Sequence, residues 1–193
     1  MYKLKEVATI TSGITKGRKT KNLNQRTVPY LSVANVKDGQ IDWNGLKTID
    51  ATEEEIAQYH LYPDDILMTE GGDPDKLGRG CAAGNVPVDC IYQNHLFRVR
   101  LNKALVNTSF FEAYMKVPFV KRYFLWCAKQ TTGIASINKT QLGEMPVIQL
   151  PLEEQERFAA FVEQSDKSKL RCSLRDLGNL RDFVMKKCFT DKL

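Results

Sequence analysis

The sequence predicts an irregular α/β (α+β) domain over residues 1–150, followed by a long C-terminal helix over residues 151–193. Apolar residues make up 42% of the chain and charged residues 26%, which is typical of a folded globular protein. Helix and strand signals are interspersed up to residue 150 without a regular β-α-β order. The composition changes at Pro151, where a region rich in Glu, Gln, Lys, Arg and Leu begins.

Strands are predicted where β-branched and aromatic residues follow turn signals, at residues 30–33, 66–69, 97–101 and 145–150. In the third of these, Phe97, Val99 and Leu101 alternate with Arg98 and Arg100. This period of two is typical of a half-buried strand whose arginines face the solvent.

Two capping boxes predict where helices begin. Thr52 with Glu55 opens a short helix, and Ser109 with Glu112 opens an aromatic-rich one. Pro118 breaks or restarts the second helix, because proline cannot continue a helix from within.

The C-terminal region predicts one long amphipathic helix. From Leu152 to about residue 188 it has no proline and one glycine, and its apolar residues recur at spacings of three and four. Such a helix extends about 50 Å, too far for a domain of about 150 residues to cover. Its apolar stripe therefore needs a partner, in a helical hairpin or in a coiled coil with another subunit. The predicted interface residues are Phe158, Phe161, Leu170, Leu174, Leu177, Leu180 and Val184.

Positive charge is concentrated in two stretches, although the net charge is only +5. Six Lys or Arg residues and no acid lie between Glu6 and Asp38, and five lie between Glu112 and Glu144, again without an acid. If the two stretches converge on one face, they form a footprint for a polyanion. The alternative is that both are merely solvated faces.

Several classes of protein are excluded or disfavoured. No apolar run approaches the roughly 18 residues of a membrane span, and the N-terminus has no signal-type stretch, so we expect a cytoplasmic protein. The five cysteines are odd in number and widely spaced, without a C-x-x-C pair, which argues against a disulfide framework or a metal site. The motifs of a methyltransferase catalytic domain are also absent from the sequence.

Residues 70–80 form a glycine-rich segment after a predicted strand. Neither the G-x-x-x-x-G-K-[ST] nor the G-x-G-x-x-G spacing is present, so a nucleotide-binding loop is not predicted. We interpret the segment as a loop that presents Lys76 and Arg79 to an anionic surface.

Candidates for catalysis are few. The two histidines, His60 and His95, lie near no nucleophile motif, and we interpret both as structural. Asp64, Asp65 and Glu70 could form a Mg²⁺-dependent nuclease site, but no distinctive lysine spacing accompanies them.

Five segments, in their order and spacing, resemble the specificity subunit of type I restriction-modification systems, the component that recognises the DNA sequence. The match covers nearly the whole chain, and the last two segments carry its strongest signature, in which strand, proline and Glu-Gln open a helix. The chain departs from the family at Asp64, where a G-D-I-L block usually has glycine. The segments are residues 4–13, 28–39, 63–69, 132–142 and 148–155.

The resemblance implies a non-enzymatic half-subunit: one target recognition domain and one conserved spacer helix, where family members carry this unit twice. The half could be a natural protein that homodimerises, a fragment of a duplicated subunit, or a remnant that supplies alternative specificity by recombination. A two-fold dimer would read two half-sites in opposite orientation. The helix would bind a second copy and the methyltransferase (M) subunits, which connect to the restriction (R) subunit. S-adenosylmethionine, ATP and Mg²⁺ would belong to those partners.

Double-stranded DNA is therefore the expected ligand. Phosphate contacts, which do not distinguish sequences, are expected from Lys16, Arg18, Lys19, Lys21 and Lys139. Base contacts are expected from Lys76, Arg79, Thr132, Ser136 and Asn138. Two other interpretations stay open: the Mg²⁺-dependent nuclease, and an assembly module whose globular part does not bind DNA.

Overall fold

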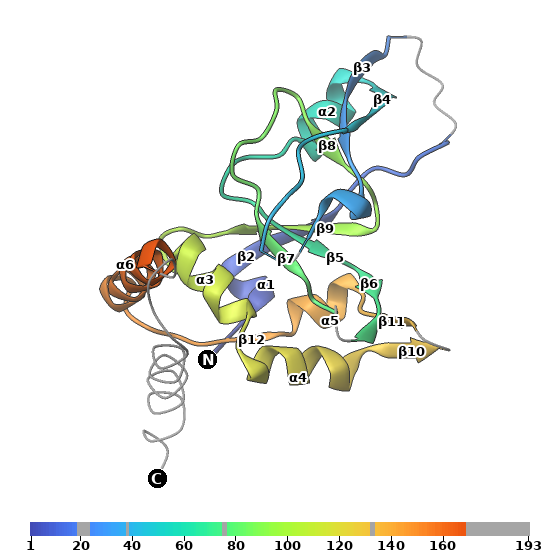
Figure 1. The fold of residues 1–193 in the computed structure, drawn as a ribbon. Helices are drawn as coiled ribbons and strands as arrows, with labels where there is room; N and C mark the ends of the chain where they lie inside the picture. Colours follow the sequence, from blue (N-terminus) through green and yellow to red (C-terminus); the bar gives the residue numbers. More distant parts are fainter. Residues whose placement is uncertain (19–23, 38, 75–76, 132–133, 169–193) are drawn as a thin grey trace.

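The computed structural model describes residues 1–18, 24–37, 39–74, 77–131 and 134–168. Its centre is a four-stranded antiparallel sheet in the order β2-β9-β5-β7 (Figure 1). Ile66 is paired with Val99 on one side and with Ala82 on the other. The strands are β2 (Ala8–Ser12), β9 (Leu96–Leu101), β5 (Ile66–Thr69) and β7 (Gly80–Ala82).

Helices cover one face of this sheet (Figure 1). The core between them contains alternate residues of β5 and β9, among them Met68 and Phe97, together with Phe111 and Phe124 from the helices. None of these four residues is more than 1% exposed. The helices are α1 (Leu4–Val7), α3 (Thr108–Met115), α4 (Pro118–Cys127), α5 (Lys139–Gly143) and α6 (Leu152–Ser168).

The opposite face of the sheet carries a smaller lobe (Figure 1). Leu67 and Leu96 point to this face and pack in a second cluster with Leu31 and Tyr92 of the lobe. The lobe contains β4 (Lys47–Ala51), β3 (Arg26–Leu31) and β8 (Ile91–Tyr92), with α2 (Glu53–Tyr59) and the 3-10 turn η1 (Val33–Asn35). Strand β3 is antiparallel to β4 and parallel to β8.

Two small sheets connect distant segments. One pairs β1 (Tyr2–Lys3) with β12 (Pro146–Val147), and the other has the order β10-β11-β6, formed by Lys129–Thr131, Ile134–Ser136 and Gly71–Gly72. A Cβ atom on Gly71 would lie 2.9 Å from the carbonyl oxygen of Ala135, so glycine allows β6 to approach β11.

The structure confirms the mixed α/β architecture and several predicted elements. Strand β5 spans residues 66–69 as predicted. The side chain of Thr52 caps α2, and Glu55 completes the capping box. Pro118 occupies the first turn of α4, where the missing N–H of proline is tolerated.

Other predictions were wrong in detail. Ser109 does not cap α3, because the Asn107 side chain accepts from the backbone N–H of Phe110 instead. Strand β3 ends at Leu31, and only two residues of the predicted strand at 145–150 are in β12. Arg98 is not solvent-facing but 6% exposed, because the smaller lobe covers its face of the sheet.

Helix α6 covers only the first part of the predicted C-terminal helix, up to Ser168, and residues 169–193 lie outside the described residues. Phe158 packs edge-on against Phe110 of its own chain, with ring centroids 5.5 Å apart, whereas Phe161 is 46% exposed. Among the described residues, no helix combines the length and apolar character needed to span a bilayer. The predicted interface residues Leu170, Leu174, Leu177, Leu180 and Val184 all lie outside the described ranges.

Candidate nucleic-acid interface

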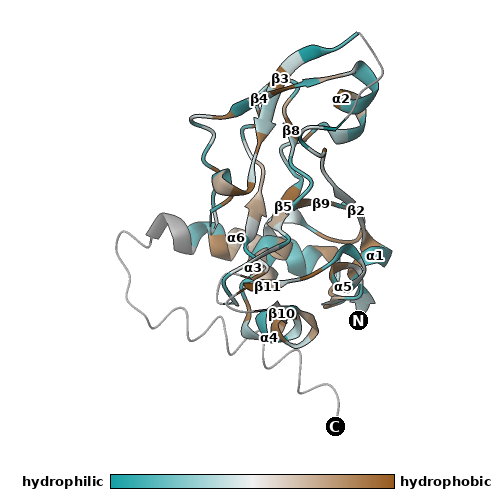
Figure 2. Ribbon diagram, turned by 90° about the vertical axis from the view of Figure 1, so that its right-hand side faces the viewer, coloured by the Kyte–Doolittle hydropathy of each residue, from teal (hydrophilic) through white to brown (hydrophobic). Residues whose placement is uncertain are grey.

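The two basic stretches extend toward the same side of the molecule. In Figure 1 the chain that follows β2, up to residue 18, reaches to the right above the central sheet, and the sheet of β6, β10 and β11 reaches to the right below it. Figure 2 views the molecule from this side, where the outer ends of β3 and β4 are hydrophilic. Part of the backbone of each basic stretch thus lies on one side of the molecule, as a shared footprint for a polyanion would require.

Arg18, predicted as a phosphate contact, is anchored to its own chain. Its guanidinium forms a bidentate ion pair with Glu55 of α2, with Nε donating to Oε1 at 2.6 Å, and also donates to the carbonyl oxygen of Asp50 at 3.1 Å. The hydrogen bonds of this pair raise the pKa of Arg18 and lower that of Glu55. Arg18 therefore suits a positioning role, whereas Lys16 is exposed two residues earlier.

A second arginine anchors the other end of this segment. Arg26, at the start of β3, binds Glu53 at 2.5 Å and Asp89 at 2.8 Å. Glu53 and Glu55, in the acidic first turn of α2, therefore form ion pairs with Arg26 and Arg18, on either side of residues 19–25. Lys19 and Lys21 lie between these anchors in the sequence and outside the described residues.

The lower part of the surface brings two predicted segments together. Ser136 of β11 is opposite Gly71 of β6, so the glycine-rich segment is paired with the second basic stretch. Asn138 caps α5, its Oδ1 accepting from the backbone N–H of Gln141 at 2.8 Å, and the adjacent Lys139 is exposed. The other two residues predicted from these segments, Lys76 and Thr132, lie outside the described ranges.

Arg79 immediately precedes β7, in a hairpin that returns from the glycine-rich segment. Its carbonyl oxygen accepts from the backbone N–H of Thr69 at 3.0 Å, which fixes its backbone against the end of β5. Its side chain is partly exposed and has no ion-pair partner among the residues that the structure describes. Arg79 is therefore free to bind an external anion or base.

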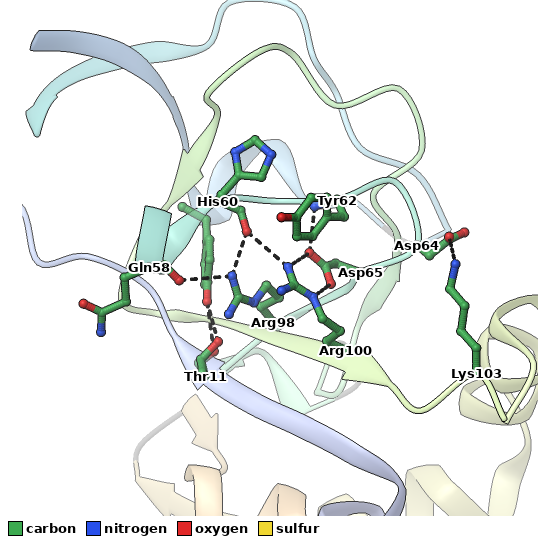
Figure 3. Close-up of polar contacts among 10 residues, drawn as sticks. Thr11, Gln58, His60, Tyr62, Asp64, Asp65, Arg98, Arg100 and Lys103 are labelled. Carbon is green, nitrogen blue, oxygen red and sulfur yellow. Dashed lines mark hydrogen bonds and ion pairs between the residues drawn. The ribbon is translucent and has the colours of Figure 1, made fainter. Parts of the chain in front are cut away.

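A buried polar network joins the smaller lobe to the sheet (Figure 3). Arg98 donates from Nη1 to the carbonyl oxygen of His60 at 2.7 Å. Arg100 holds the 1% exposed Asp65 through two hydrogen bonds of 2.7 and 2.8 Å. Asp65 also accepts from the backbone N–H of Tyr62 at 2.7 Å, and the Arg100 guanidinium lies 4.3 Å from the ring centroid of Tyr62. These contacts join the loop that follows α2 to strand β9 of the central sheet.

The geometry does not favour the nuclease interpretation. Each of the three candidate carboxylates has a partner of its own: Asp64 with Lys103, Asp65 with Arg100 and Glu70 with His95. Within the described ranges, no group of three or more His, Cys, Asp or Glu residues could hold a metal ion.

Burial raises the pKa of the Cys90 thiol to about 12, which leaves it protonated at neutral pH.

Gln155 belongs to the Glu-Gln signature at the start of the C-terminal helix, but its role was not predicted from the sequence. Its side chain is 1% exposed and makes three hydrogen bonds of 2.9 Å. Its Nε2 donates to the carbonyl oxygens of Leu105 and Leu150, and its Oε1 accepts from the backbone N–H of Asn107. Gln155 therefore fixes the start of α6 to the loop before α3.

Glu144 at the end of α5 predicts a pH effect on stability. It forms ion pairs with Lys3 at 2.6 Å and with Lys5, and these contacts lower its pKa to about 2. A lowered carboxyl pKa stabilises the fold above the ordinary value of 4.5, and this contribution is lost as pH falls toward 2. Glu144→Gln should therefore make the free energy of unfolding less dependent on pH in this window, as measured by urea denaturation. Glu156→Gln, an exposed carboxylate on α6, is the control and should leave the wild-type slope unchanged.

Comparison with protein families gives one match over most of the chain. The model described as type I restriction modification DNA specificity domain matches residues 1–173. The chain is 25% identical over 193 residues to a putative type I restriction enzyme MjaX specificity subunit of Methanocaldococcus jannaschii, covering 98% of this chain and 45% of the relative. It is 24% identical over 173 residues to the type I restriction enzyme EcoKI specificity subunit of Escherichia coli K12, covering 86% and 37%. The chain thus spans less than half the length of these relatives.

Solved structures show the same fold. The crystal structure of the HsdS subunit from Thermoanaerobacter tengcongensis aligns with a TM-score of 0.58 and 18% identity, over 100% of this chain and 45% of that one. The S subunit of a type I restriction-modification system from M. genitalium aligns with a TM-score of 0.55 and 15% identity, over 86% and 38%.

Proposed function

Since the chain belongs to the family of type I restriction modification DNA specificity domains, we propose that it recognises a specific sequence in double-stranded DNA and catalyses no reaction itself. The family match over residues 1–173 carries this proposal. The position of both basic stretches on one side of the molecule supports it, because a duplex is a continuous polyanion.

Two kinds of contact are proposed on this surface. Lys16 and Lys139 are exposed and would bind phosphates, while Arg18 would hold the segment after β2 in place through Glu55. Arg79, Ser136 and Asn138 would contact bases. Lys19, Lys21, Lys76 and Thr132 keep the roles predicted from the sequence.

The proposal extends to the partners. The relatives are specificity subunits of type I restriction enzymes, so this chain would direct methyltransferase and restriction subunits to the DNA. S-adenosylmethionine, ATP and Mg²⁺ would be held by those subunits. One recognition domain reads one half-site, so a bipartite site would need two copies joined through the C-terminal helices. Phe161, exposed on α6, is a described residue available for this contact.

Selection of duplexes from a randomised pool, followed by anisotropy titrations at several salt concentrations, tests the proposal. Arg79→Ala should weaken binding to the selected sequence by about 1 to 3 kcal/mol and relax the preference at one base pair. The double variant with Lys16→Ala and Lys139→Ala should weaken binding to all sequences alike and reduce the salt slope by about 0.9 for each lost phosphate contact.

Arg157→Ala serves as the control, because it removes a cation that pairs with Glu153 on α6, away from the proposed surface. It should change neither the selected sequence nor the salt slope. The proposal is wrong if the wild-type protein enriches no sequence, and cleavage of plasmid DNA in Mg²⁺ would support the nuclease instead.

A further inference from the structure

The turn between β8 and β9, residues 93–95, lies on the same side of the molecule as the two basic stretches and between them (Figure 1). It leaves the smaller lobe and enters the central sheet, so it marks the junction of the two faces. A structural role was predicted for His95, and no role was predicted for Gln93 or Asn94.

Three separate segments hold the backbone of this turn. The N–H of Asn94 donates to the carbonyl oxygen of Ile14 at 3.1 Å, and the carbonyl oxygen of His95 accepts from the N–H of Glu70 at 3.0 Å. The side-chain oxygen of Gln93 accepts from a backbone N–H of η1 at 3.2 Å. The turn is therefore a fixed platform, as base recognition requires, since donors and acceptors must meet base edges in defined positions.

Two side chains of the turn have free hydrogen-bonding capacity. The side chain of His95 is 60% exposed, and its Nδ1 lies 2.9 Å from Oε2 of Glu70. The Glu70 carboxylate accepts a hydrogen bond from Nδ1–H, which leaves Nε2 of the exposed ring for an external partner. Asn94 is partly exposed, and its side-chain amide has no hydrogen bond within the part of the chain that the structure describes.

We propose that Asn94 and His95 read bases in the major groove and that Glu70 is the positioning residue for His95. This inference rests on the proposed DNA binding. An asparagine amide can pair with N6 and N7 of adenine, and the exposed Nε2 of a histidine can form a hydrogen bond with a base edge. Asn94 therefore selects adenine at its position, and His95 selects a base whose major-groove edge is complementary to Nε2.

A phosphate contact at the turn is disfavoured by its charge. Asn94 carries no charge. The ring of His95 contacts the carboxylate of Glu70, whose negative charge would repel a phosphate group. The turn thus differs from the flanking stretches, whose exposed lysines suit phosphates. This division matches the general pattern in which phosphate contacts position a protein and base contacts specify the sequence.

The test is to repeat the selection from the randomised pool with Asn94→Ala and His95→Ala. Each variant should lose the preference at one base pair and bind the wild-type motif roughly tenfold or more weakly, while affinity for random duplex is unchanged. Glu70→Gln should weaken the preference at the same base pair as His95→Ala, because it removes the charge that fixes the ring. A merely structural role would not single out that base pair.

Asn85→Ala, in an exposed loop elsewhere on the chain, is the matched control and should enrich the wild-type motif. Thermal unfolding of every variant checks that the fold is intact. If the Asn94 and His95 variants enrich the unchanged motif, this inference is overturned while the proposed function stands. If the wild-type protein itself enriches no motif, the proposed function fails and the inference fails with it.

Discussion

Replacing Gln155 by alanine should lower the free energy of unfolding by about 3 kcal/mol. The side chain satisfies the carbonyl oxygens of Leu105 and Leu150 and the N–H of Asn107 at a position with 1% exposure. Alanine leaves all three backbone groups without these hydrogen bonds, and an unsatisfied buried group costs about 1 to 3 kcal/mol. Urea denaturation followed by circular dichroism measures the loss.

Gln164→Ala makes the same chemical change at an exposed position of the same helix. It should alter the free energy of unfolding by less than about 0.5 kcal/mol. Equal effects of the two substitutions would show that the buried hydrogen bonds of Gln155 are not the source of stability. In that case α6 would be held to the rest of the described structure mainly by apolar contacts, such as that of Phe158 with Phe110.

Asp65→Asn should destabilise the protein by about 2 to 3 kcal/mol. The carboxylate is 1% exposed and accepts two hydrogen bonds from Arg100 and one from the N–H of Tyr62. An amide cannot accept both guanidinium hydrogen bonds in the same way, so Arg100 loses its counter-ion. The arginine side chain is 38% exposed, and its partial hydration keeps the loss below that of a fully buried charge.

The neighbouring Asp64 provides the matched comparison. It pairs with Lys103, and the two side chains are 53% and 67% exposed. Asp64→Asn should therefore change the free energy of unfolding by less than about 0.5 kcal/mol, because exposed ion pairs contribute little. Thermal and urea denaturation of both variants measure the difference. A similar loss at both positions would mean that burial does not decide the strength of these pairs.

Local signals could predict the secondary structure where one short segment decides it. The box of Thr52 and Glu55 is such a case, since both of its hydrogen bonds form within α2 and its cap. The box at Ser109 and Glu112 failed because Asn107, two residues earlier, is an equally good cap. Sequence spacing alone does not decide between two such neighbours.

Contacts between distant residues could not be predicted in this way. Arg98 alternates with apolar neighbours as in a half-buried strand, yet the smaller lobe covers it. Its partner, the carbonyl oxygen of His60, lies 38 residues away in the sequence. Whether a strand face is covered depends on tertiary packing, which the period-two pattern does not report.

The residues of the candidate surface also divide into those that local sequence signals predicted and those that depend on contacts between distant residues. The two basic stretches were evident from charge alone, and the structure shows their shared side. The role of Arg18 was not evident, because the sequence does not show that Glu55 binds it. The turn at residues 93–95 has no charge cluster or motif, so only its position between the stretches points to a role.

The pairing of β1 with β12 brings Tyr2 opposite Val147, immediately before the segment that leads into α6. The chain from Tyr2 to Val147 thus returns to its starting point, and Gln155 and Phe158 of α6 pack onto the same globular part. A module closed in this way can be inserted into a different polypeptide, or exchanged for another of its kind, with little strain at the junction. For the DNA recognition proposed above, a new sequence specificity would then be acquired by exchanging the whole module, rather than by altering its surface one residue at a time.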